Sequence, residues 1–373
     1  MPTADAVRTA LASVLDPEIR RPITDLGMVR SVDVDGDRVE VGIDLTTAGC
    51  PLRDTLTRDI TAAVGALDGV ASVNVSMGVM SAEQREELRT SLRGGPSPVI
   101  PFAQPNNLTK VYAIASGKGG VGKSSVTSNL AAAMAADGLQ VGVVDADVYG
   151  FSVPRMLSVD RAPTKVDDMI LPPIAQGVKV ISIGMFVPPG QPVVWRGPML
   201  HRALEQFLAD VFWGDLDVLL LDLPPGTGDI AISVAQLLPS SELLVVTTPQ
   251  LAAAEVAERA GSIATQTRQH VVGVVENMSW FTAPDGSRIE VFGSGGGAAV
   301  AENLSTVTGT TVPLLAQVPM QTSLREAGDG GVPVVISDPD SPAAQALRGV
   351  ARALATRSRG LAGKSLGVTP VQR

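Results

Sequence analysis

Cysteine, histidine and the aromatic residues are scarce in this 373-residue sequence. Cys50 is the only cysteine, there are two histidines, and aromatic residues make up 3% of the chain. A single cysteine excludes a disulfide within the chain and any metal site built from several cysteines of one chain. Neither His201 nor His270 has a second ligand at metal-binding spacing, so we expect packing or surface roles for both.

Long apolar runs and a leader-like start are also missing. No stretch is apolar for long enough to span a bilayer, so we expect no membrane span. The segment Met1–Ala10 has neither a basic start nor an apolar block, which predicts a cytoplasmic protein.

Positive charge is in deficit. The formal net charge is −9 and the sequence pI is about 4.9. This charge opposes the electrostatic attraction that dominates nonspecific nucleic-acid binding, so we expect no nucleic-acid partner. Arg348 and Arg352 alternate with apolar residues of the segment Leu347–Leu354 at helical spacing. That pattern favours a last helix packed on the core over a membrane-surface helix.

The residues that are present suit two α/β domains. A hydrophobic content of 45% in a chain of this length is enough for two cores. Between residues 93 and 107, four prolines and two glycines predict a linker. We therefore predict a small α/β domain over residues 1–92, a larger domain over residues 108–360 and a flexible tail over residues 361–373.

Alternating hydrophobic patterns give the elements of the small domain. We predict helices near Ala4–Leu15 and Leu52–Ala66, and strands near Val29–Val34, Val39–Leu45 and Ala71–Met77. The turn residues Asp35-Gly36-Asp37 between the first two strands predict a hairpin.

The larger domain alternates apolar strands with helices. After the first strand, we predict further strands near Val141–Val144, Val218–Leu223, Leu243–Thr248, Val271–Val275 and Val312–Val318. This rhythm is typical of a doubly wound, mostly parallel sheet. Right-handed crossovers then bring the carboxyl ends of the strands to one edge, where open α/β sheets bind their ligands.

A phosphate-binding loop follows the first strand of the larger domain. Four residues separate Gly117 from Gly122, and Lys123-Ser124 follow directly. The apolar run Val111–Ile114 precedes this loop and a helix-like stretch, Val126–Ala136, follows it. A plain glycine turn does not require both Lys and Ser after the last glycine, so the pattern predicts a P-loop NTPase.

Each residue type in the loop has a chemical role. Glycines let backbone N–H groups approach a polyphosphate, and the helix N-terminus attracts anions. We expect Lys123 to reach the β- and γ-phosphates and the Ser124 hydroxyl to bind Mg²⁺. The predicted nucleotide-binding residues of the loop are Gly117, Lys118, Gly119, Gly120, Val121, Gly122, Lys123, Ser124 and Ser125.

Carboxylates follow two of the predicted strands. Asp222 ends one strand and best fits the carboxylate beside Mg²⁺. Asp147, after another strand, best fits positioning of the attacking water, and Gly226 can offer its N–H toward the γ-phosphate. Asp145 fits either a functional role or the capping of a turn or helix.

A second lysine, Lys118, comes too early in the loop to be its ordinary phosphate ligand. The run Lys118–Ser124 resembles the deviant Walker A ATPases, which include the partition ATPases, the Min-type division regulators and the Mrp/ApbC carriers. This resemblance implies a homodimer in which Lys118 crosses to the nucleotide of the partner. A cation supplied in that way stabilises charge on the transferred phosphoryl group, so Lys118, Lys123 and Asp147 are the predicted catalytic residues.

The same resemblance assigns two residues to the base. Asn277 closes a predicted strand, and its amide would recognise the adenine edge, because an amide both donates and accepts hydrogen bonds. Pro319 lies in the loop that would border the base.

The small domain resembles the α/β domain of cytosolic iron–sulfur assembly factors over about residues 4 to 80. The segments Asp16–Ile19, Asp25–Gly27 and Thr46–Pro51 carry this resemblance. Cys50 follows a strand and precedes a helix, where a thiolate gains from the helix N-terminus. We therefore favour an iron–sulfur ligand at Cys50 over a buried apolar cysteine.

The whole chain resembles the Mrp/ApbC iron–sulfur cluster carriers, through the phosphate loop, Asp222–Asp229 and Glu276–Ser279. Those carriers are homodimeric ATPases that bind a cluster between subunits and pass it to apoproteins. The alternatives are a cluster-free, ATP-dependent adaptor in iron–sulfur assembly and a partitioning or positioning ATPase of the ParA/MinD type. The acidic pI argues against the last of these.

The sequence departs from that family at one place. The family commonly has a Cys-x-x-Cys pair after the Glu-Asn-Met-Ser segment, but Trp280–Glu290 contains no cysteine, and Pro284-Asp285-Gly286 predicts a hairpin turn. A [4Fe–4S] cluster normally takes about four thiolates. A cluster shared across the dimer would have Cys50 from each subunit and would need small thiols, histidine or carboxylates to complete its ligands.

Overall fold

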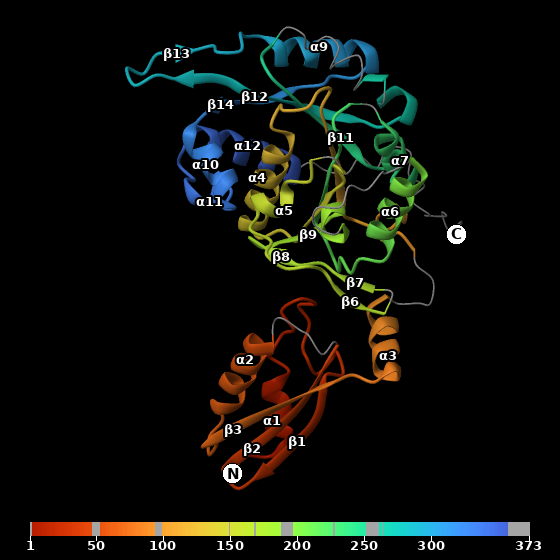
Figure 1. Ribbon diagram of the computed structural model, residues 1–373, viewed down its shortest axis with the longest axis vertical. Helices are drawn as coiled ribbons and strands as arrows, with labels where there is room; N and C mark the ends of the chain where they lie inside the picture. The colour runs from red at the N-terminus through yellow and green to blue at the C-terminus, as the bar shows by residue number, and fades with distance from the viewer. Residues whose placement is uncertain are drawn as a thin grey trace, which may run out of the picture.

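The computed structural model describes residues 2–46, 53–93, 99–148, 150–167, 169–187, 197–226, 228–250, 261–262 and 264–356. Cys50 and the tail predicted over residues 361–373 lie outside these ranges. Two α/β units follow one another along the chain, each built around its own sheet (Figure 1). Among the described residues, no helix combines the length and the apolar character that a membrane crossing requires.

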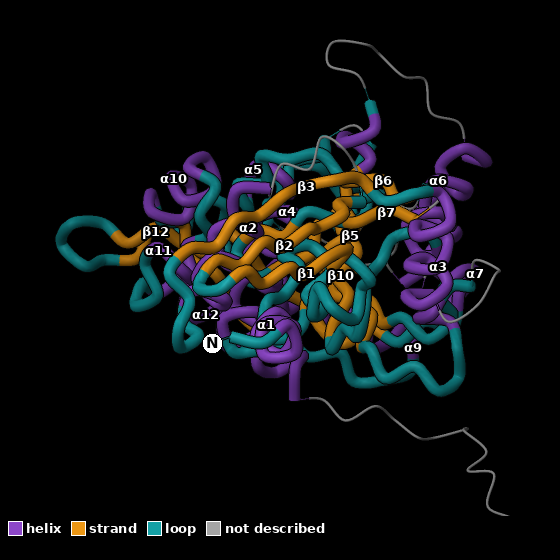
Figure 2. The backbone as a smooth tube through the Cα atoms, turned by 90° about the horizontal axis from the view of Figure 1, so that it is seen from below, coloured by secondary structure: helices purple, strands orange, loops and turns teal. Residues whose placement is uncertain are grey.

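The N-terminal unit has a three-stranded sheet. Its elements are α1 (Ala4–Leu11), β1 (Val29–Asp35), β2 (Arg38–Leu45), α2 (Arg53–Gly65), β3 (Ser72–Val79) and α3 (Ala82–Arg93). Strands β1 and β2 form the predicted antiparallel hairpin around Gly36, whose φ of 64° suits glycine. Strand β3 runs parallel to β2 (Figure 2).

The larger unit is a doubly wound sheet, as predicted. Its strands are β4 (Lys110–Ala115), β5 (Val141–Asp145), β8 (Ile174–Ala175), β9 (Val178–Ser182), β10 (Val218–Asp222), β11 (Glu242–Thr247), β12 (Val271–Thr282), β13 (Arg288–Ile289) and β14 (Leu314–Met320). The order is β13-β12-β11-β4-β10-β5-β9-β8, and β14 pairs with β12. All pairings are parallel except β12 with β13 and β8 with β9.

Helices cover both faces of this sheet (Figure 1). The helices α4 (Lys123–Ala136), α5 (Val153–Met156), α10 (Thr322–Gly330), α11 (Val334–Ser337) and α12 (Pro342–Thr356) pack on one face. The helices α6 (Gly197–Ala209), α7 (Asp229–Leu237) and α9 (Gly296–Thr308) pack on the other. Helix α12 confirms the predicted last helix on the core.

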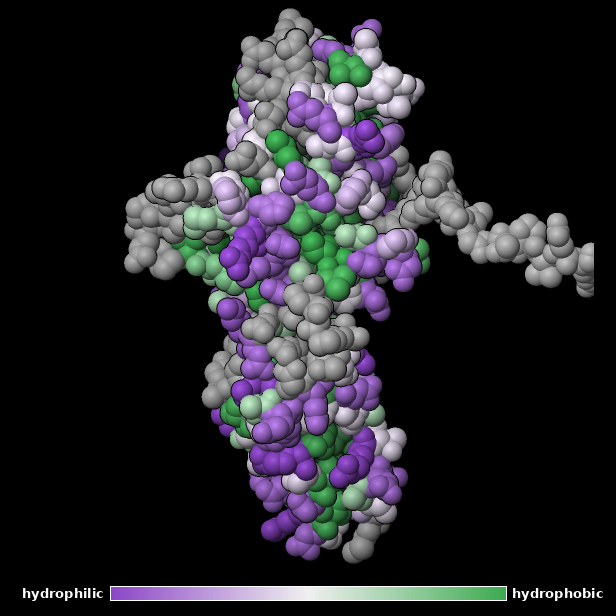
Figure 3. Space-filling view, turned by 90° about the vertical axis from the view of Figure 1, so that its right-hand side faces the viewer, coloured by the Kyte–Doolittle hydropathy of each residue, from purple (hydrophilic) through white to green (hydrophobic). Residues whose placement is uncertain are grey.

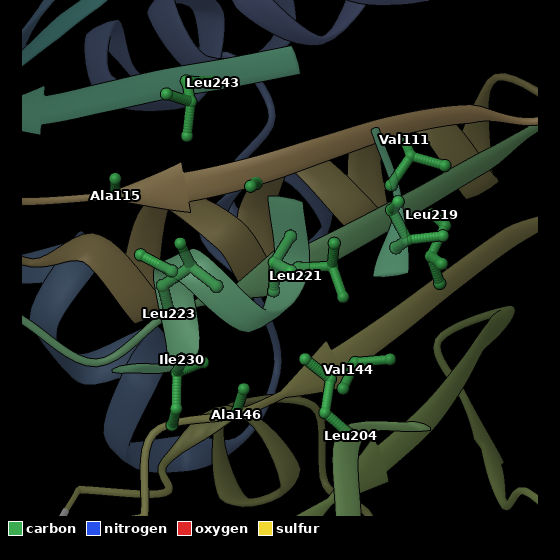
Figure 4. Close-up of a cluster of buried hydrophobic side chains, with 14 of the residues drawn as sticks. Val111, Ala115, Val144, Ala146, Leu204, Leu219, Leu221, Leu223, Ile230 and Leu243 are labelled. Atoms are coloured by element: carbon green, nitrogen blue, oxygen red, sulfur yellow. The ribbon is translucent and has the colours of Figure 1, made fainter. Parts of the chain in front are cut away.

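Successive residues of the central strand enter two different cores. Leu219 and Leu221 of β10 belong to the core under α6 and α7 (Figure 4), whereas Leu220 belongs to the core under α4 and α12. All five residues of β10 are buried. A parallel strand buried on both faces reads as a continuous apolar run, which is why the sequence pattern identified it.

Apolar surface remains on the side of the molecule that carries α6 and α7. Figure 3 shows green apolar areas there among purple polar residues. The exposed large apolar side chains of these two helices are Met199 and Ile232, which are 48% and 39% exposed.

The sequence patterns did not predict every element of the fold. Strand β9 is parallel to β5, and the Nζ of its buried Lys179 donates a hydrogen bond to the Trp213 carbonyl at 2.6 Å. The segment predicted as an irregular linker contains a short 3-10 helix, Pro101–Ala103. There Phe102 is 2% exposed, and its ring lies 6.3 Å from that of Trp213.

Candidate nucleotide site

The predicted phosphate loop joins β4 to α4 at the carboxyl edge of the sheet. Gly120 and Gly122 have φ values of 77° and 82°, a conformation that favours glycine. A Cβ on Gly122 would lie 2.2 Å from Nδ2 of Asn277. Backbone conformation and close packing therefore both require glycine at position 122.

A cavity of about 290 Å³ opens over this loop. Its lining includes every predicted loop residue except Gly117, which lies in the loop but not on the cavity wall. The lining residues are Ser116, Lys118, Gly119, Gly120, Val121, Gly122, Lys123, Ser124, Ser125, Asp147, Gly150, Ser152, Met156 and Pro225. Loop, helix N-terminus and Asp147 thus come together as the sequence predicts.

Lys123 and Ser124, which line the cavity, form a polar network with Asp222, which is buried and does not line it. Lys123 Nζ lies 2.8 Å from Asp222 Oδ2, and Ser124 Oγ donates a hydrogen bond to the same oxygen at 2.6 Å. Asp222 is fully buried and Lys123 is 6% exposed. A cation and a hydroxyl donor surround this carboxylate and replace the water that burial removes.

Thr127 completes this network, and the sequence analysis missed it. Its Oγ1 donates to Asp222 Oδ1 at 2.7 Å and also lies 3.0 Å from the carbonyl oxygen of Lys123. Thr127 is fully buried on α4, one helical turn after Lys123. The i,i+4 spacing from the phosphate lysine was the signal that could have identified it.

The open question about Asp145 is answered by its hydrogen bonds. Its carboxylate accepts the N–H of Asp147 at 3.2 Å and that of Val153 at 3.3 Å. Asp145 therefore fixes the segment between β5 and α5, which agrees with the capping alternative. Burial, and then the negative charge of Asp222, raises the pKa of Asp145 to about 7.

Asp147 lies on the cavity wall, as its predicted role requires. It is 8% exposed, and its Oδ1 accepts the N–H of Gly150 at 3.1 Å. This bond holds the carboxylate at the edge of the cavity beside the phosphate loop. Positioning of the attacking water by Asp147 stays a prediction.

Lys118 lines the cavity but is not part of the Lys123–Asp222 ion pair. Its Nζ donates to Oε1 of Gln250, a residue that follows β11. Lys118 is thus held at the rim of the cavity, apart from the ion pair of Lys123. Its contact with a partner's nucleotide stays a prediction.

Gly226 differs from its predicted orientation. Its N–H donates to the Ser116 carbonyl at 2.8 Å, with a φ of 91°. The same N–H can meet a γ-phosphate only after this bond breaks. The phosphate contact therefore stays a prediction and requires movement of the loop after β10.

Asn277 braces the phosphate loop in this structure. Its Nδ2 donates to the Val121 carbonyl at 2.9 Å, and the residue is 3% exposed. In the β12–β14 ladder it is opposite Val318, which precedes Pro319. Neither Asn277 nor Pro319 lines the cavity. Their predicted adenine contacts stay predictions, and the brace on the loop is a second role for Asn277.

The side-chain oxygen atoms of Ser124 and Asp222 suit Mg²⁺. This ion prefers oxygen ligands, and it usually takes one or two carboxylates together with substrate phosphates. Ser124 and Asp222 supply a hydroxyl and a carboxylate that already converge at 2.6 Å. These two residues therefore fit the predicted magnesium site.

The described residues offer less for an iron–sulfur cluster. Within them, no group of three or more His, Cys, Asp and Glu side chains could hold a metal. His270 Nδ1 lies 3.4 Å from Glu242 Oε1 at the surface, which agrees with its predicted surface role. Between β12 and β13, residues 284–286 form the predicted hairpin turn.

Comparisons with known proteins agree with this geometry. The family model described as NUBPL iron-transfer P-loop NTPase matches residues 107–355. The model described as iron–sulfur cluster assembly protein matches residues 4–77. A nucleotide-binding protein from Archaeoglobus fulgidus, solved with ADP, is 35% identical with a TM-score of 0.53, covering 62% of this chain and 89% of its own.

Curated relatives extend over both units. The iron–sulfur cluster carrier protein of Mycobacterium tuberculosis is 65% identical over 370 residues, which cover 99% of this chain and 97% of that protein. The carrier protein of Deinococcus radiodurans is 43% identical over 354 residues, 94% of each chain. With its phosphate loop, its buried Lys–Asp pair and these matches, the chain belongs to the iron–sulfur cluster carrier family of P-loop NTPases.

Proposed function

We propose that this protein is a homodimeric, Mg²⁺-dependent ATPase of the cytoplasm that binds iron–sulfur clusters and passes them to apoproteins. The observation that carries the ATPase part is the convergence of Lys123, Ser124 and Asp222 beneath the phosphate loop. The carrier part is supported by the family and by full-length relatives named as carriers. A single cysteine and a net charge of −9 suit a reducing compartment without a nucleic-acid partner.

Hydrolysis in this site would rest on positioning and charge. The backbone N–H groups of the loop and Lys123 bind the β- and γ-phosphates, and Asp147 orients a water in line with the γ-phosphorus. A new P–O bond forms to that water as the bond to the β–γ bridging oxygen breaks. Mg²⁺, held by Ser124 and Asp222, would neutralise charge on the phosphates. Lys118 of the partner subunit would stabilise the charge of the transferred group.

A variant of the early lysine tests this division of roles. Lys118→Ala should keep most of the affinity for Mg–ATP and lower hydrolysis by about 100-fold or more, since it removes a charge used in the transition state. Equilibrium titration with a fluorescent ATP analogue, phosphate release and sedimentation with a non-hydrolysable analogue measure affinity, rate and dimerisation. Complete loss of affinity in Lys118→Ala would show that the assigned role is wrong.

The cluster is the cargo of the proposed carrier. A dimer contributes one Cys50 thiolate from each subunit, and small-molecule thiols would complete a [4Fe–4S] ligand set. Anaerobic reconstitution of the wild type and of Cys50→Ala with iron and sulfide tests this arrangement. Metal analysis, visible absorption and transfer to an apo-acceptor should show a cluster in the wild type only.

One observation favours a second function. The sequence has a single cysteine, and the β12–β13 hairpin has none. If neither the wild type nor Cys50→Ala holds a cluster while both bind ATP, the protein is a cluster-free adaptor that uses ATP to recruit assembly partners.

A further inference from the structure

A small hairpin lies between the two units of the chain. It consists of β6 (Thr164–Val166) and β7 (Met169–Leu171), paired antiparallel. Successive side chains of a strand point to opposite faces. In β7, Ile170 belongs to the core of the larger unit, whereas Met169 and Leu171 belong to the core of the small domain. One short strand is thus shared between two cores.

Backbone hydrogen bonds fix this hairpin to the larger unit. Ile170 N–H donates to the Asp210 carbonyl at 2.9 Å, and Phe212 N–H donates to the Ile170 carbonyl at 2.8 Å. Asp210 and Phe212 follow helix α6 directly. The hairpin therefore moves with the larger unit, unless these bonds break.

Side chains fix the same hairpin to the small domain. Val166, Met169 and Leu171 are 0%, 1% and 1% exposed within the small domain's core. Thr164 Oγ1 donates to Glu18 Oε1 at 3.1 Å, and Asp167 pairs with Arg85 of α3 at 3.4 Å. The apolar part dominates this contact, because the ion pair is partly exposed and such pairs contribute little.

The hairpin is also connected to the nucleotide cavity. Ser152 and Met156, at the two ends of α5, line the cavity. Residues 157–163 alone separate Met156 from the hairpin. This connection is held in place: Leu157 is fully buried, and Ser158 Oγ donates to the Gly331 carbonyl at 2.9 Å.

We propose that the β6–β7 hairpin couples docking of the small domain to nucleotide binding, so that each favours the other. The docked domain holds the hairpin, and the hairpin in turn holds the part of the cavity wall that includes Ser152 and Met156. A wall that is already ordered costs less conformational entropy when the nucleotide binds. The inference rests on the nucleotide site of the proposed function and adds its regulation.

The coupling is reciprocal. If docking strengthens nucleotide binding, a bound nucleotide must strengthen docking by the same factor. The docking of the small domain therefore follows the nucleotide state of the site.

The first test breaks the docking contact in the full-length chain. Met169→Asp places a carboxylate in the small domain's core, whereas Lys165→Asp places the same side chain on the exposed face of β6. Titration with a fluorescent ATP analogue and Mg²⁺ should show affinity at least about 5-fold weaker in Met169→Asp. Lys165→Asp should stay within about 2-fold of the wild type. Equal affinities of Met169→Asp and the wild type, with the hairpin shown to be undocked by hydrogen exchange, would overturn the coupling.

The second test needs no variant. Mg–ATP or a non-hydrolysable analogue should slow hydrogen exchange of the wild type in β6, β7 and α3. A bound nucleotide that leaves exchange in these elements unchanged would overturn the coupling alone. A wild type that binds no nucleotide would overturn the proposed ATPase and the coupling with it.

Discussion

Two ion pairs of nearly equal length lie in very different surroundings. In the larger sheet, Lys123 and Asp222 are 2.8 Å apart, and their side chains are 6% and 0% exposed. In the small sheet, Arg30 and Asp44 are 2.7 Å apart, and their side chains are 46% and 8% exposed. Each charge of a buried pair needs the attraction of the other, because neither charge is hydrated. An exposed arginine stays hydrated. Burial rather than distance therefore decides what each pair contributes.

The largest effect should come from breaking the buried pair. Lys123→Ala leaves Asp222 and Asp145 buried without their cation, which should lower the free energy of unfolding by about 3–5 kcal/mol. The same change removes the phosphate ligand, so binding of Mg–ATP should be lost. Chemical denaturation and nucleotide titration measure the two effects. Lys118→Ala is the matched control: stability equally reduced in both variants would contradict the special status of the buried pair.

Truncation of a side chain should likewise cost more stability in the large sheet than in the small one. Leu220→Ala in fully buried β10 should cost about 2–5 kcal/mol, because it leaves a cavity between sheet and helices. Val73→Ala in half-buried β3 should cost roughly 1 kcal/mol. Hydrogen exchange in urea, followed separately for β10 and β3, reports each unit. Similar costs in the two strands would show that the small sheet is packed as tightly as the large one.

Thr127 tests how far the buried network extends beyond its ion pair. Thr127→Val keeps the shape but removes the hydroxyl that donates to Asp222, which should cost about 1–3 kcal/mol. It should also raise the Mg²⁺ concentration that half-maximal ATPase activity requires, since Asp222 loses a fixed orientation. Thr127→Ser restores the hydroxyl and should restore the Mg²⁺ dependence. A serine variant that behaves like valine would mean that packing of the methyl group matters instead.

The pH dependence of the free energy of unfolding should show the titration of Asp145. Its pKa is raised from 3.8 to about 7 in the folded protein. Between these pH values the folded state binds more protons than the unfolded state, so the contribution of Asp145 to stability falls as the pH rises. Asp145→Asn cannot titrate and should gain stability relative to the wild type from about pH 4 to about pH 7. Parallel stability curves, measured by urea unfolding without nucleotide and Mg²⁺, would contradict this.

The exposed pair should give the smallest effect. Arg30→Ala removes a half-exposed partner of Asp44, and the Gln84 amide still donates to this carboxylate at 3.4 Å, so the cost should be about 1 kcal/mol or less. Raising the salt concentration should reduce the difference from the wild type, because ions screen exposed charges. A loss comparable to that in Lys123→Ala would show that the small sheet excludes water as fully as the large one.

The parts of the fold that follow from local patterns were predictable. The apolar run of β10, the Gly36 hairpin and the phosphate loop each carry their signal within a few residues. Strand β9 does not, because burial of Lys179 depends on a carbonyl more than thirty residues away along the chain. Phe102 likewise packs against Trp213, which is distant in the sequence. The proline-rich segment around Phe102 therefore did not predict the contact.

The candidate site likewise has features that the sequence predicts and contacts that it does not. The sequence identified the residues that reach the cavity from the loop and from the strand ends, such as Lys123 and Asp147. It could not show that Asn277 bonds the loop carbonyl of Val121 or that Gly226 bonds Ser116. Those contacts depend on how distant segments meet, and the residue types alone are compatible with several partners.

The shared strand β7 has a consequence for dissecting this protein. If the chain were shortened to its ATPase unit, Val166, Met169 and Leu171 would lose the core that now covers them. Three adjoining apolar side chains on a short hairpin would then face water and favour self-association. An isolated ATPase unit should resist aggregation only when polar residues replace these three, so the small domain also keeps its neighbour soluble.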